Sequence, residues 1–298
     1  MEGDIQHQPV LLAEVLDLLI TDQEGLYLDA TLGLGGHSES ILRAISPKGR
    51  LLGLDMDLEA IAISERRLKA QSERFSAFRA NFRSVAQVLE ERRFFPLSGA
   101  LFDLGVSSLH FEKAERGFSF SREGPLDMRL SPDNPLTADT IVNRWPEEQL
   151  ALLIKEFGED PAARRIAKGI ADRRRKRPFA STVDLASFIA SILPRAAGIH
   201  PATRTFMALR IAVNAELENL TRGLEGILPF LKIGGRLAVI SFHSLEDRIV
   251  KRLFASFVTH GHCKVVEKAA GGIRPSEQEL EINPRARSAR LRVVEKLR

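Results

Sequence analysis

The first hundred residues alternate short apolar runs with helical patterns, and this alternation constrains the fold more than any other feature. A helix placed between two strands returns the chain across the sheet, so repeated strand-helix order favours a parallel sheet with helices on its faces. Helical periodicity covers residues 38–45 and 58–71. The expected strands are residues 26–30, 51–55, 75–80 and 99–104.

The pattern changes after Gly105. No buried strand is expected between about residues 111 and 201, where Pro146, Asp160-Pro161 and the capping box Ser181 to Asp184 mark helix starts instead. A long amphipathic helix over about 206–231 then precedes strands at 235–242, 264–267 and 291–294. We therefore expect an α/β protein in three parts: a first sheet segment (1–110), a smaller helical insertion (111–204) and a second sheet segment (205–298).

Composition excludes several classes of protein. The chain of 298 residues has a formal net charge of only +4, so charge matters mainly where it clusters. Its single cysteine, Cys263, excludes an internal disulfide and a zinc site built on several cysteines. His260 and His262 flank it, but no further ligand is evident, so no metal site is expected. The N-terminus lacks the pattern of a signal peptide and no apolar run has membrane-spanning length, which predicts a cytoplasmic protein.

Chemistry-bearing residues follow the first two expected strands. The first strand leads into a turn containing Gly33, Gly35, Gly36 and His37, where glycines allow a ligand close to the backbone and a helix begins. Asp55 ends the second strand about twenty residues later, a separation that places an acid against ribose hydroxyls. A purely structural tight turn and a dinucleotide-binding fingerprint are the alternatives. Ser38 occupies the place of the fingerprint's third glycine, which weakens the second.

The next two expected strands also end in candidate residues. Phe82 follows the third strand, and its ring either lies against adenine or belongs to the core. Asp103 ends the fourth strand, with His110 shortly after it. An acid on an apolar strand costs free energy without a partner, so we interpret Asp103 as a ligand or substrate contact. Asp57, by contrast, is expected to cap the helix that begins at residue 58.

Motifs spanning nearly the whole chain resemble one known family. They are HQPVLLAEVL, DATLGLGGHS, DLGVSS, ERGFSFSREGPLDMR, HPATRTFMALRIAVNAEL, GGRLAVISFHSLEDRIVKR and NPRARSARLR, in that order. Together they resemble the bacterial 16S ribosomal RNA (cytosine-N4)-methyltransferases. This resemblance implies a Rossmann-like methyltransferase sheet interrupted by a helical domain, S-adenosylmethionine as cofactor, and methyl transfer to the exocyclic amine of a cytosine in the decoding region of the small subunit.

The resemblance also implies which residues contact the cofactor. The family's cofactor-contacting positions match Gly35, Gly36, His37, Asp55, Phe82, Asp103 and His110. One departure concerns the segment after DLGVSS, where the family usually continues with Pro-Gln and this chain has Leu109-His110. The contact made by His110 is therefore in doubt.

Asp103 is the candidate catalytic residue, because a hydrogen bond from the target amine to its carboxylate, or to a group in its DLGVSS loop, would orient the lone pair of that amine. The loop after the strand at 235–242 supplies substrate candidates: Ser241, Phe242 for stacking, and His243 for hydrogen bonding, with Arg204 as a further one. Core or capping roles for Ser241 and Asp247 are equally compatible with the sequence. A Ser-His-Asp hydrolase is disfavoured because no G-x-S-x-G motif precedes these residues.

Two basic clusters are candidates for contact with RNA phosphates, although charge runs are often only solvated surface. The target base must leave its stack to react, and Phe118, Phe120 and Met128 either form its pocket or pack at a domain interface. A nicotinamide dehydrogenase and a non-catalytic ribosome-assembly factor are the rival functions; the intact glycines, Asp55 and Asp103 argue against the second. The first cluster contains Arg164, Arg165, Lys168 and residues 173–177, and the second contains Arg285, Arg287, Arg290 and Arg292.

Overall fold

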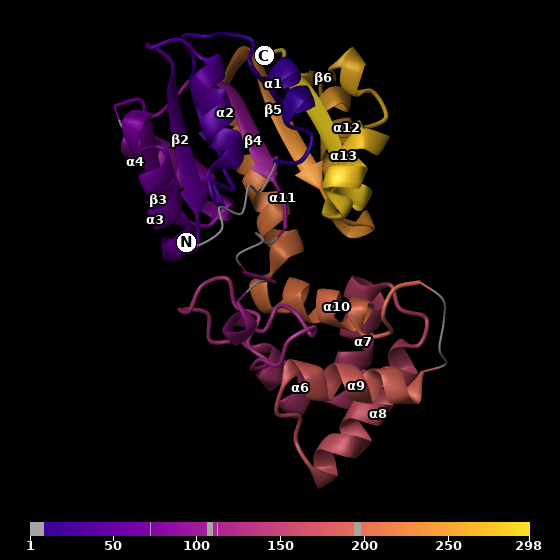
Figure 1. The fold of residues 1–298 in the computed structure, drawn as a ribbon. Helices are drawn as coiled ribbons and strands as arrows, with labels where there is room; N and C mark the ends of the chain where they lie inside the picture. The colour runs from indigo at the N-terminus through magenta and orange to yellow at the C-terminus, as the bar shows by residue number, and fades with distance from the viewer. Residues whose placement is uncertain (1–8, 72, 106–109, 112, 194–197) are drawn as a thin grey trace. The chain divides into compact units, whose positions relative to one another are not determined.

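The computed structural model describes residues 9–71, 73–105, 110–111, 113–193 and 198–298. The chain divides into two compact units, each with its own core. The first unit combines Met1–Gly105 with Leu217–Arg298, and the second is Val106–Glu216. A helical unit therefore interrupts a sheet-containing unit in the sequence (Figure 1).

The first unit contains a seven-stranded sheet in the order β3-β2-β1-β4-β5-β7-β6. Strands β3, β2, β1, β4 and β5 run parallel, as the strand-helix alternation predicts, whereas β7 is antiparallel to both β5 and β6. This order is the Rossmann-like arrangement expected from the sequence. The strands are β1 (Leu26–Asp29), β2 (Arg50–Asp55), β3 (Phe75–Arg79), β4 (Leu97–Asp103), β5 (Leu231–Ser241), β6 (Cys263–Val265) and β7 (Arg290–Lys296).

Helices cover both faces of this sheet because successive residues of its strands point to opposite faces. Tyr27 packs into one apolar core with helices α1 and α2, and its neighbour Leu28 packs into the other with α4, α11 and α12. The helices of this unit are α1 (Leu12–Leu19), α2 (Gly36–Ala44), α3 (Leu58–Arg67), α4 (Val85–Arg92), α11 (Glu216–Ile227), α12 (Ser244–Thr259) and α13 (Glu277–Ile282), with short 3-10 turns at Lys69–Gln71, Phe82–Ser84, Leu228–Phe230, Glu267–Ala269 and Pro284–Ser288.

The described residues of the second unit form helices joined by loops and no strand, as predicted. The Ser181 hydroxyl accepts the Asp184 backbone N–H, which confirms the N-cap that the sequence predicts there. Pro146 lies at the N-cap of α7. Asp160 accepts the backbone N–H of Ala162, and the helix begins at Ala163. The elements are a 3-10 turn (Ala114–Arg116), α6 (Ala138–Arg144), α7 (Glu147–Gly158), α8 (Ala163–Lys176), α9 (Thr182–Ile192) and α10 (Thr203–Asn214).

The expected single helix over 206–231 is wrong. Two helices occupy this stretch, because Ala215 adopts a left-handed conformation with φ of 50° and ends α10. The side chain of Asn214 holds this end in place: its amide donates to Met128 O and its carbonyl accepts the Leu130 N–H. Helix α10 belongs to the second unit, since Phe206 and Leu209 lie in that core. The boundaries between the compact units fall after residues 105 and 216, whereas the boundaries expected from the sequence fall after residues 110 and 204.

Candidate active site

The turn after β1 places a helix start at the carboxyl edge of the sheet. Gly35 has φ of 78° and is the N-cap residue of α2. A Cβ atom at this position would lie 3.2 Å from the Ser64 hydroxyl oxygen, so both conformation and space require glycine. Gly36 and His37 form the first turn of α2, where backbone N–H groups have no partner inside the helix. The turn therefore presents hydrogen-bond donors to a ligand with polar oxygens.

Asp55 at the end of β2 braces this turn. Its Oδ2 accepts the Gly33 N–H at 2.8 Å, and its Oδ1 accepts the Asp57 N–H at 2.9 Å. The Asp55 carboxylate thus lies beside the glycine turn, and its contact with ribose hydroxyls stays a prediction. Asp57 caps α3 by accepting the Glu59 N–H, as the sequence predicts.

Phe82 stands at the edge of a core. Its ring packs edge-on against Phe102, with ring centres 5.7 Å apart, and it is only partly buried. A Cβ on Gly223 of α11 would lie 2.9 Å from the Phe82 ring, so that glycine makes room for it. Core packing is therefore one role of this ring, and contact with adenine stays a prediction.

Asp103 at the end of β4 lies beside His37. The Nε2 atom of His37 is 3.5 Å from Asp103 Oδ2, and the His37 side chain is only 6% exposed. Asp103 Oδ1 is buried and accepts no hydrogen bond from any described residue. The backbone N–H of Asp103 donates to the Thr31 hydroxyl at 2.7 Å. One carboxylate oxygen thus faces an imidazole while the other keeps its accepting capacity. The motif residues 106–108 that follow lie outside the described residues.

Another acid, Asp29, stands at the end of β1 and is buried. It is 1% exposed, accepts the Ser38 hydroxyl at 2.7 Å and accepts the Thr31 N–H at 3.2 Å. Burial raises the pKa of Asp29 to about 6, an effect that the Ser38 and Thr31 hydrogen bonds oppose and the Asp55 carboxylate reinforces. Burial also raises the pKa of Asp103 well above its ordinary value, with further contributions from Asp29 and Glu246.

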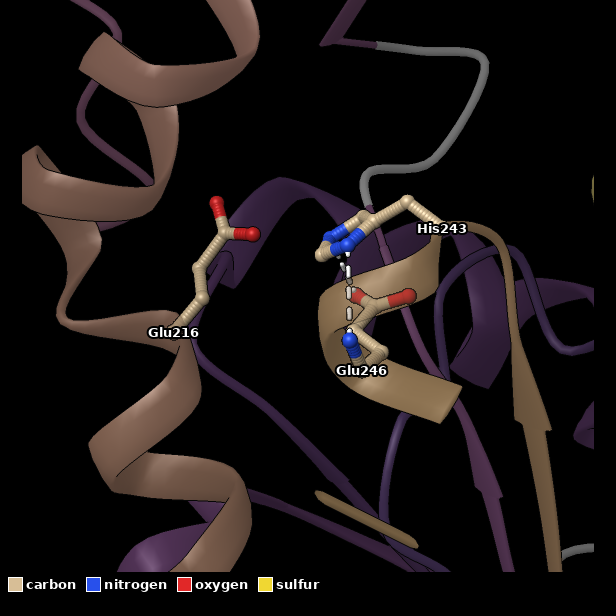
Figure 2. Close-up of side chains that lie close together, drawn as sticks. All are labelled: Glu216, His243 and Glu246. Atoms are coloured by element: carbon tan, nitrogen blue, oxygen red, sulfur yellow. Dashed lines mark hydrogen bonds and ion pairs between the residues drawn. The ribbon is translucent and has the colours of Figure 1, made fainter. Parts of the chain in front are cut away.

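The loop after β5 is organised by Glu246, which is 3% exposed. Its Oε2 accepts the Phe242 N–H at 2.8 Å, and its Oε1 lies 3.2 Å from His243 Nε2. His243 caps α12 because its Nδ1 faces the Glu246 N–H at 3.4 Å. Figure 2 shows the His243 imidazole turned toward the Glu246 carboxylate. Ser241 is buried and its hydroxyl is 3.4 Å from Arg290 O, so its visible role is structural.

Two arginines of the second predicted RNA cluster are held inside the first unit. Arg292 donates to both carboxylate oxygens of Asp247, and Arg290 contacts one of them at 3.3 Å. Burial alone would raise the pKa of Asp247, but hydrogen bonds and charge from Arg292 and charge from Arg290 lower it. Arg290 and Arg292 thereby anchor α12 to β7, and their contact with RNA phosphates stays a prediction. Arg285 and Arg287 are exposed.

The first basic cluster also contains both arginines that hold the packing of the protein and cations that are exposed. Arg173 pairs with Asp184 and lies over the Phe179 ring, while Arg174 donates to the carbonyls of Val142 and Trp145. These two arginines stabilise the packing of α8. The exposed cations of α8, which we name the α8 basic face, are Arg164, Arg165, Lys168, Arg175 and Lys176.

The remaining predicted site residues belong to the second unit. His110 is buried with its ring centre 5.1 Å from that of Phe118, and its cofactor contact stays a prediction. Arg204 is exposed and donates to Glu159 O at 2.7 Å. Phe118 and Met128 lie in the core of this unit, and Phe120 packs on Phe206 and His200.

Sequence reasoning missed four residues of this site: Asp29, Thr31, Ser38 and Glu246. Asp29 could have been found, because it ends a buried strand as Asp103 does. Ser38 was noted only as the place where a glycine is missing, and its hydroxyl in fact holds Asp29. Nothing in the spacing around Glu246 separates it from its neighbours Ser244 and Asp247.

The comparison with known proteins decides the family. The MraW methylase family matches residues 4–297. The chain belongs to this family. A methylase of the family uses S-adenosylmethionine, which is the cofactor here, and the fold is that of a Rossmann-like methyltransferase. The "Ribosomal RNA small subunit methyltransferase H" of Syntrophobacter fumaroxidans is 47% identical over 98% of this chain and 97% of its own length.

A second relative agrees with this assignment. The protein of the same name from Stenotrophomonas maltophilia strain K279a is 46% identical over 97% of this chain and 93% of its own. A solved putative rRNA-methylase from Clostridium thermocellum is more distant, with 11% identity and a TM-score of 0.47 over 96% of this chain and 93% of its own. None of the described helices of the MraW-family chain is both long and apolar enough to cross a bilayer.

Proposed function

We propose that this methyltransferase transfers a methyl group from S-adenosylmethionine to the exocyclic N4 amine of a cytosine in the decoding region of 16S ribosomal RNA, within the small ribosomal subunit. The names of its relatives support ribosomal RNA as substrate. The observation that carries the chemical part is the placement of Asp103 at the end of β4, with one buried oxygen that accepts no hydrogen bond from a described residue.

The cofactor is assigned to the edge formed by the ends of β1, β2 and β4. Gly35, Gly36 and His37 begin a helix there, and Asp55 at the end of β2 is the proposed partner of the ribose hydroxyls. The open Oδ1 of Asp103 and the close approach that Gly35 permits fit a ligand rich in polar groups. Phe82 completes the proposed set within the first unit, and the cofactor contact of His110 stays a prediction.

Positioning accounts for most of the proposed chemistry. The cytosine amine is a weak nucleophile because its lone pair is delocalised into the ring. When bound, S-adenosylmethionine supplies a methyl carbon that its sulfonium charge already activates. Asp103 Oδ1 accepts a hydrogen bond from the amine and directs the lone pair toward the reacting carbon. Alignment of this kind contributes up to about 7–11 kcal/mol in favourable systems. Phe242 and His243 are the proposed contacts of the base, with Ser241 supporting the loop.

RNA binding is assigned to the second unit. The α8 basic face presents five cations on one helix, and phosphate contacts from such a face give affinity without sequence preference. Arg204 is a further proposed contact. The target cytosine must leave its stack before its amine can be reached.

The test is methyl incorporation into small subunits isolated from a strain that lacks the corresponding gene. Labelled methyl groups should appear at one cytosine, which mass spectrometry of nuclease fragments locates, and the modified nucleoside should be N4-methylcytidine. Asp103→Asn should lower turnover at saturating cofactor by about 100-fold or more, a range typical for loss of a positioned catalytic group.

Two results would contradict the proposal. Incorporation at a carbon or at a ribose oxygen would refute the N4 assignment. Subunit binding without any incorporation would instead favour an assembly factor with this fold. If Asp103→Ala bound the cofactor poorly but kept full turnover at saturation, Asp103 would not contact the amine. Exposed Asp17 on α1 offers the matched control Asp17→Asn.

A further inference from the structure

Asp29 and Asp103 form a linked pair of acids. In the sheet register Asp29 lies beside Leu101 of β4, so Asp103 is two positions further along the neighbouring strand. Thr31 joins the two acids: its backbone N–H donates to Asp29 Oδ1, and its hydroxyl accepts the Asp103 N–H. The charge of Asp29 also raises the pKa of Asp103, so ionisation of one acid affects the other.

Other titratable groups around the pair are mostly acidic. The charge of Asp55 on β2 helps to raise the pKa of Asp29, and the charge of Glu246 on α12 helps to raise the pKa of Asp103. His37 from α2 is the basic group nearest Asp103, at 3.5 Å. Among the described residues, no lysine or arginine forms an ion pair with either acid of the pair. Burial without a cationic partner favours the neutral, protonated carboxyl.

Three other acids of the protein pair with a lysine or an arginine. Asp22 pairs with Lys232, Asp127 with Arg129, and Asp184 with Arg173, and each of these carboxyls has a lowered pKa. Among the described residues, neither acid of the pair at the strand ends has a lysine or arginine partner of the kind that these three acids have. A bound ligand can supply the positive charge instead.

The methyl donor and its product differ in charge by one unit. S-adenosylmethionine carries a sulfonium, an ammonium and a carboxylate, with a net charge of +1 near neutral pH. S-adenosylhomocysteine has lost the sulfonium charge and is neutral overall. A pocket that becomes anionic when it is filled therefore favours the donor over the product.

We propose that binding of the cationic donor is coupled to loss of a proton from the Asp29–Asp103 pair, and that Asp29 thereby determines the preference for donor over product without contacting either. This inference rests on the proposed cofactor site. On binding, a carboxyl O–H bond breaks and the proton passes to solvent. On transfer, the amine forms a bond to the methyl carbon, the carbon–sulfur bond breaks, and the amine loses one proton. The ionised pair takes up that proton, which returns it to the neutral state that holds the product weakly.

The direction of the pH dependence follows. At low pH the pair is protonated and must release a proton to accept the donor, so donor binding weakens as pH falls. Where one full proton is released, the dissociation constant changes tenfold per pH unit. Binding of the neutral product should change much less over the same range, because no sulfonium charge drives the ionisation.

The experiment is titration calorimetry of the full-length protein with S-adenosylmethionine and with S-adenosylhomocysteine, between pH 5.5 and 8, in buffers of different ionisation enthalpy. The buffer dependence of the heat gives the number of protons released. We expect up to one proton per donor molecule at the acidic end of this range and clearly fewer for the product.

Three variants test the role of Asp29. Asp29→Asn keeps an oxygen that accepts the Ser38 hydroxyl but cannot ionise, so proton release should fall and the preference for donor over product should drop by roughly tenfold, the equivalent of one pKa unit. Ser38→Ala removes a hydrogen bond that stabilises the ionised form, so proton release should move to higher pH. Asp17→Asn, which removes an exposed carboxylate, should leave both quantities unchanged. Thermal melting checks that each variant is folded.

The outcomes separate this inference from the proposed function. Donor binding without proton release, or equal release with donor and product, would refute the coupling and leave the cofactor site standing. Unchanged proton release in both Asp29→Asn and Ser38→Ala would show that Asp29 takes no part in the coupling. Failure of the wild-type protein to bind the donor would refute the coupling and the proposed cofactor site together.

Discussion

Asp55 Oδ2 accepts the backbone N–H of Gly33 at 2.8 Å, across 22 residues of sequence. One carboxylate at the end of β2 therefore holds the loop that follows β1. The same group is proposed to bind the ribose of the cofactor, so the shape of the turn and the affinity for the ligand depend on one side chain.

Replacing Asp55 should affect both properties. Asp55→Ala should weaken binding of S-adenosylmethionine by at least about 100-fold, because it removes charged hydrogen bonds worth roughly 1.5–3 kcal/mol each. Asp55→Asn retains one acceptor oxygen and should lose less. Calorimetry measures the affinity, and Glu65→Gln on the exposed side of α3 is the control. Equal losses in the Ala and Asn variants would argue against the dual role.

Gly35→Ala should destabilise the protein more than a matched glycine replacement. Gly234 has φ of 77°, close to the 78° of Gly35, but a Cβ on Gly234 would meet no atom within 4 Å. Gly234→Ala therefore reports the backbone strain alone, about 1–2 kcal/mol. Gly35→Ala adds the contact with Ser64, and chemical denaturation should show the difference. If the two variants lose the same stability, the contact with Ser64 costs nothing.

Asp29 should make the cofactor-free protein less stable as pH rises. Its pKa of about 6 lies above the value for an unfolded chain, so the folded state binds the proton more tightly. Stability is then lost between about pH 4 and pH 6, by about 3 kcal/mol at most. Asp29→Asn should raise the melting temperature at pH 7.5 and change it little at pH 4. A lower melting temperature at pH 7.5 would contradict the buried-acid interpretation.

RNA binding and thermal stability should distinguish the exposed cations of α8 from Arg174, which holds the packing of that helix. Arg164→Ala combined with Lys168→Ala should weaken RNA binding and reduce its salt dependence, by about 0.7–0.9 in the logarithmic slope for each phosphate that no longer pairs with a cation. Stability should change little. Arg174→Ala should instead lower the melting temperature, because Arg174 donates to Val142 O and Trp145 O. An unchanged salt slope in the double variant would exclude this face from RNA binding.

Ala215→Gly should stabilise the end of α10. Ala215 has φ of 50°, a conformation that glycine adopts without strain. The gain should be about 1 kcal/mol or less, because glycine also gains freedom in the unfolded chain. Denaturant titration measures it, and Ala212→Gly inside the helix is expected to destabilise instead. A loss of stability in Ala215→Gly would show that other contacts fix this backbone.

The sequence predicts strands and turns well where the hydrophobic periodicity and the placement of glycines agree. The parallel strands and the turn at Gly35 follow from local patterns. The break at Ala215 does not, because alanine is the strongest helix former and its left-handed conformation comes from tertiary contacts. Arg290 and Arg292 resemble any other surface cations in sequence, and only the fold brings Asp247 to them. The raised pKa of Asp29 comes from burial of its carboxyl, and a position at the end of a strand does not by itself predict that burial.

The anchoring of Asp247 by Arg290 and Arg292 bears on the order in which contacts can form during synthesis of the chain. These arginines lie 43 and 45 residues after the acid that they hold. During translation the loop bearing His243 emerges well before the strand that fixes it. The contact of Asp247 with Arg290 and Arg292 can therefore form only after β7 has been synthesised, whereas the glycine turn at Gly35 needs residues from the first part of the chain alone.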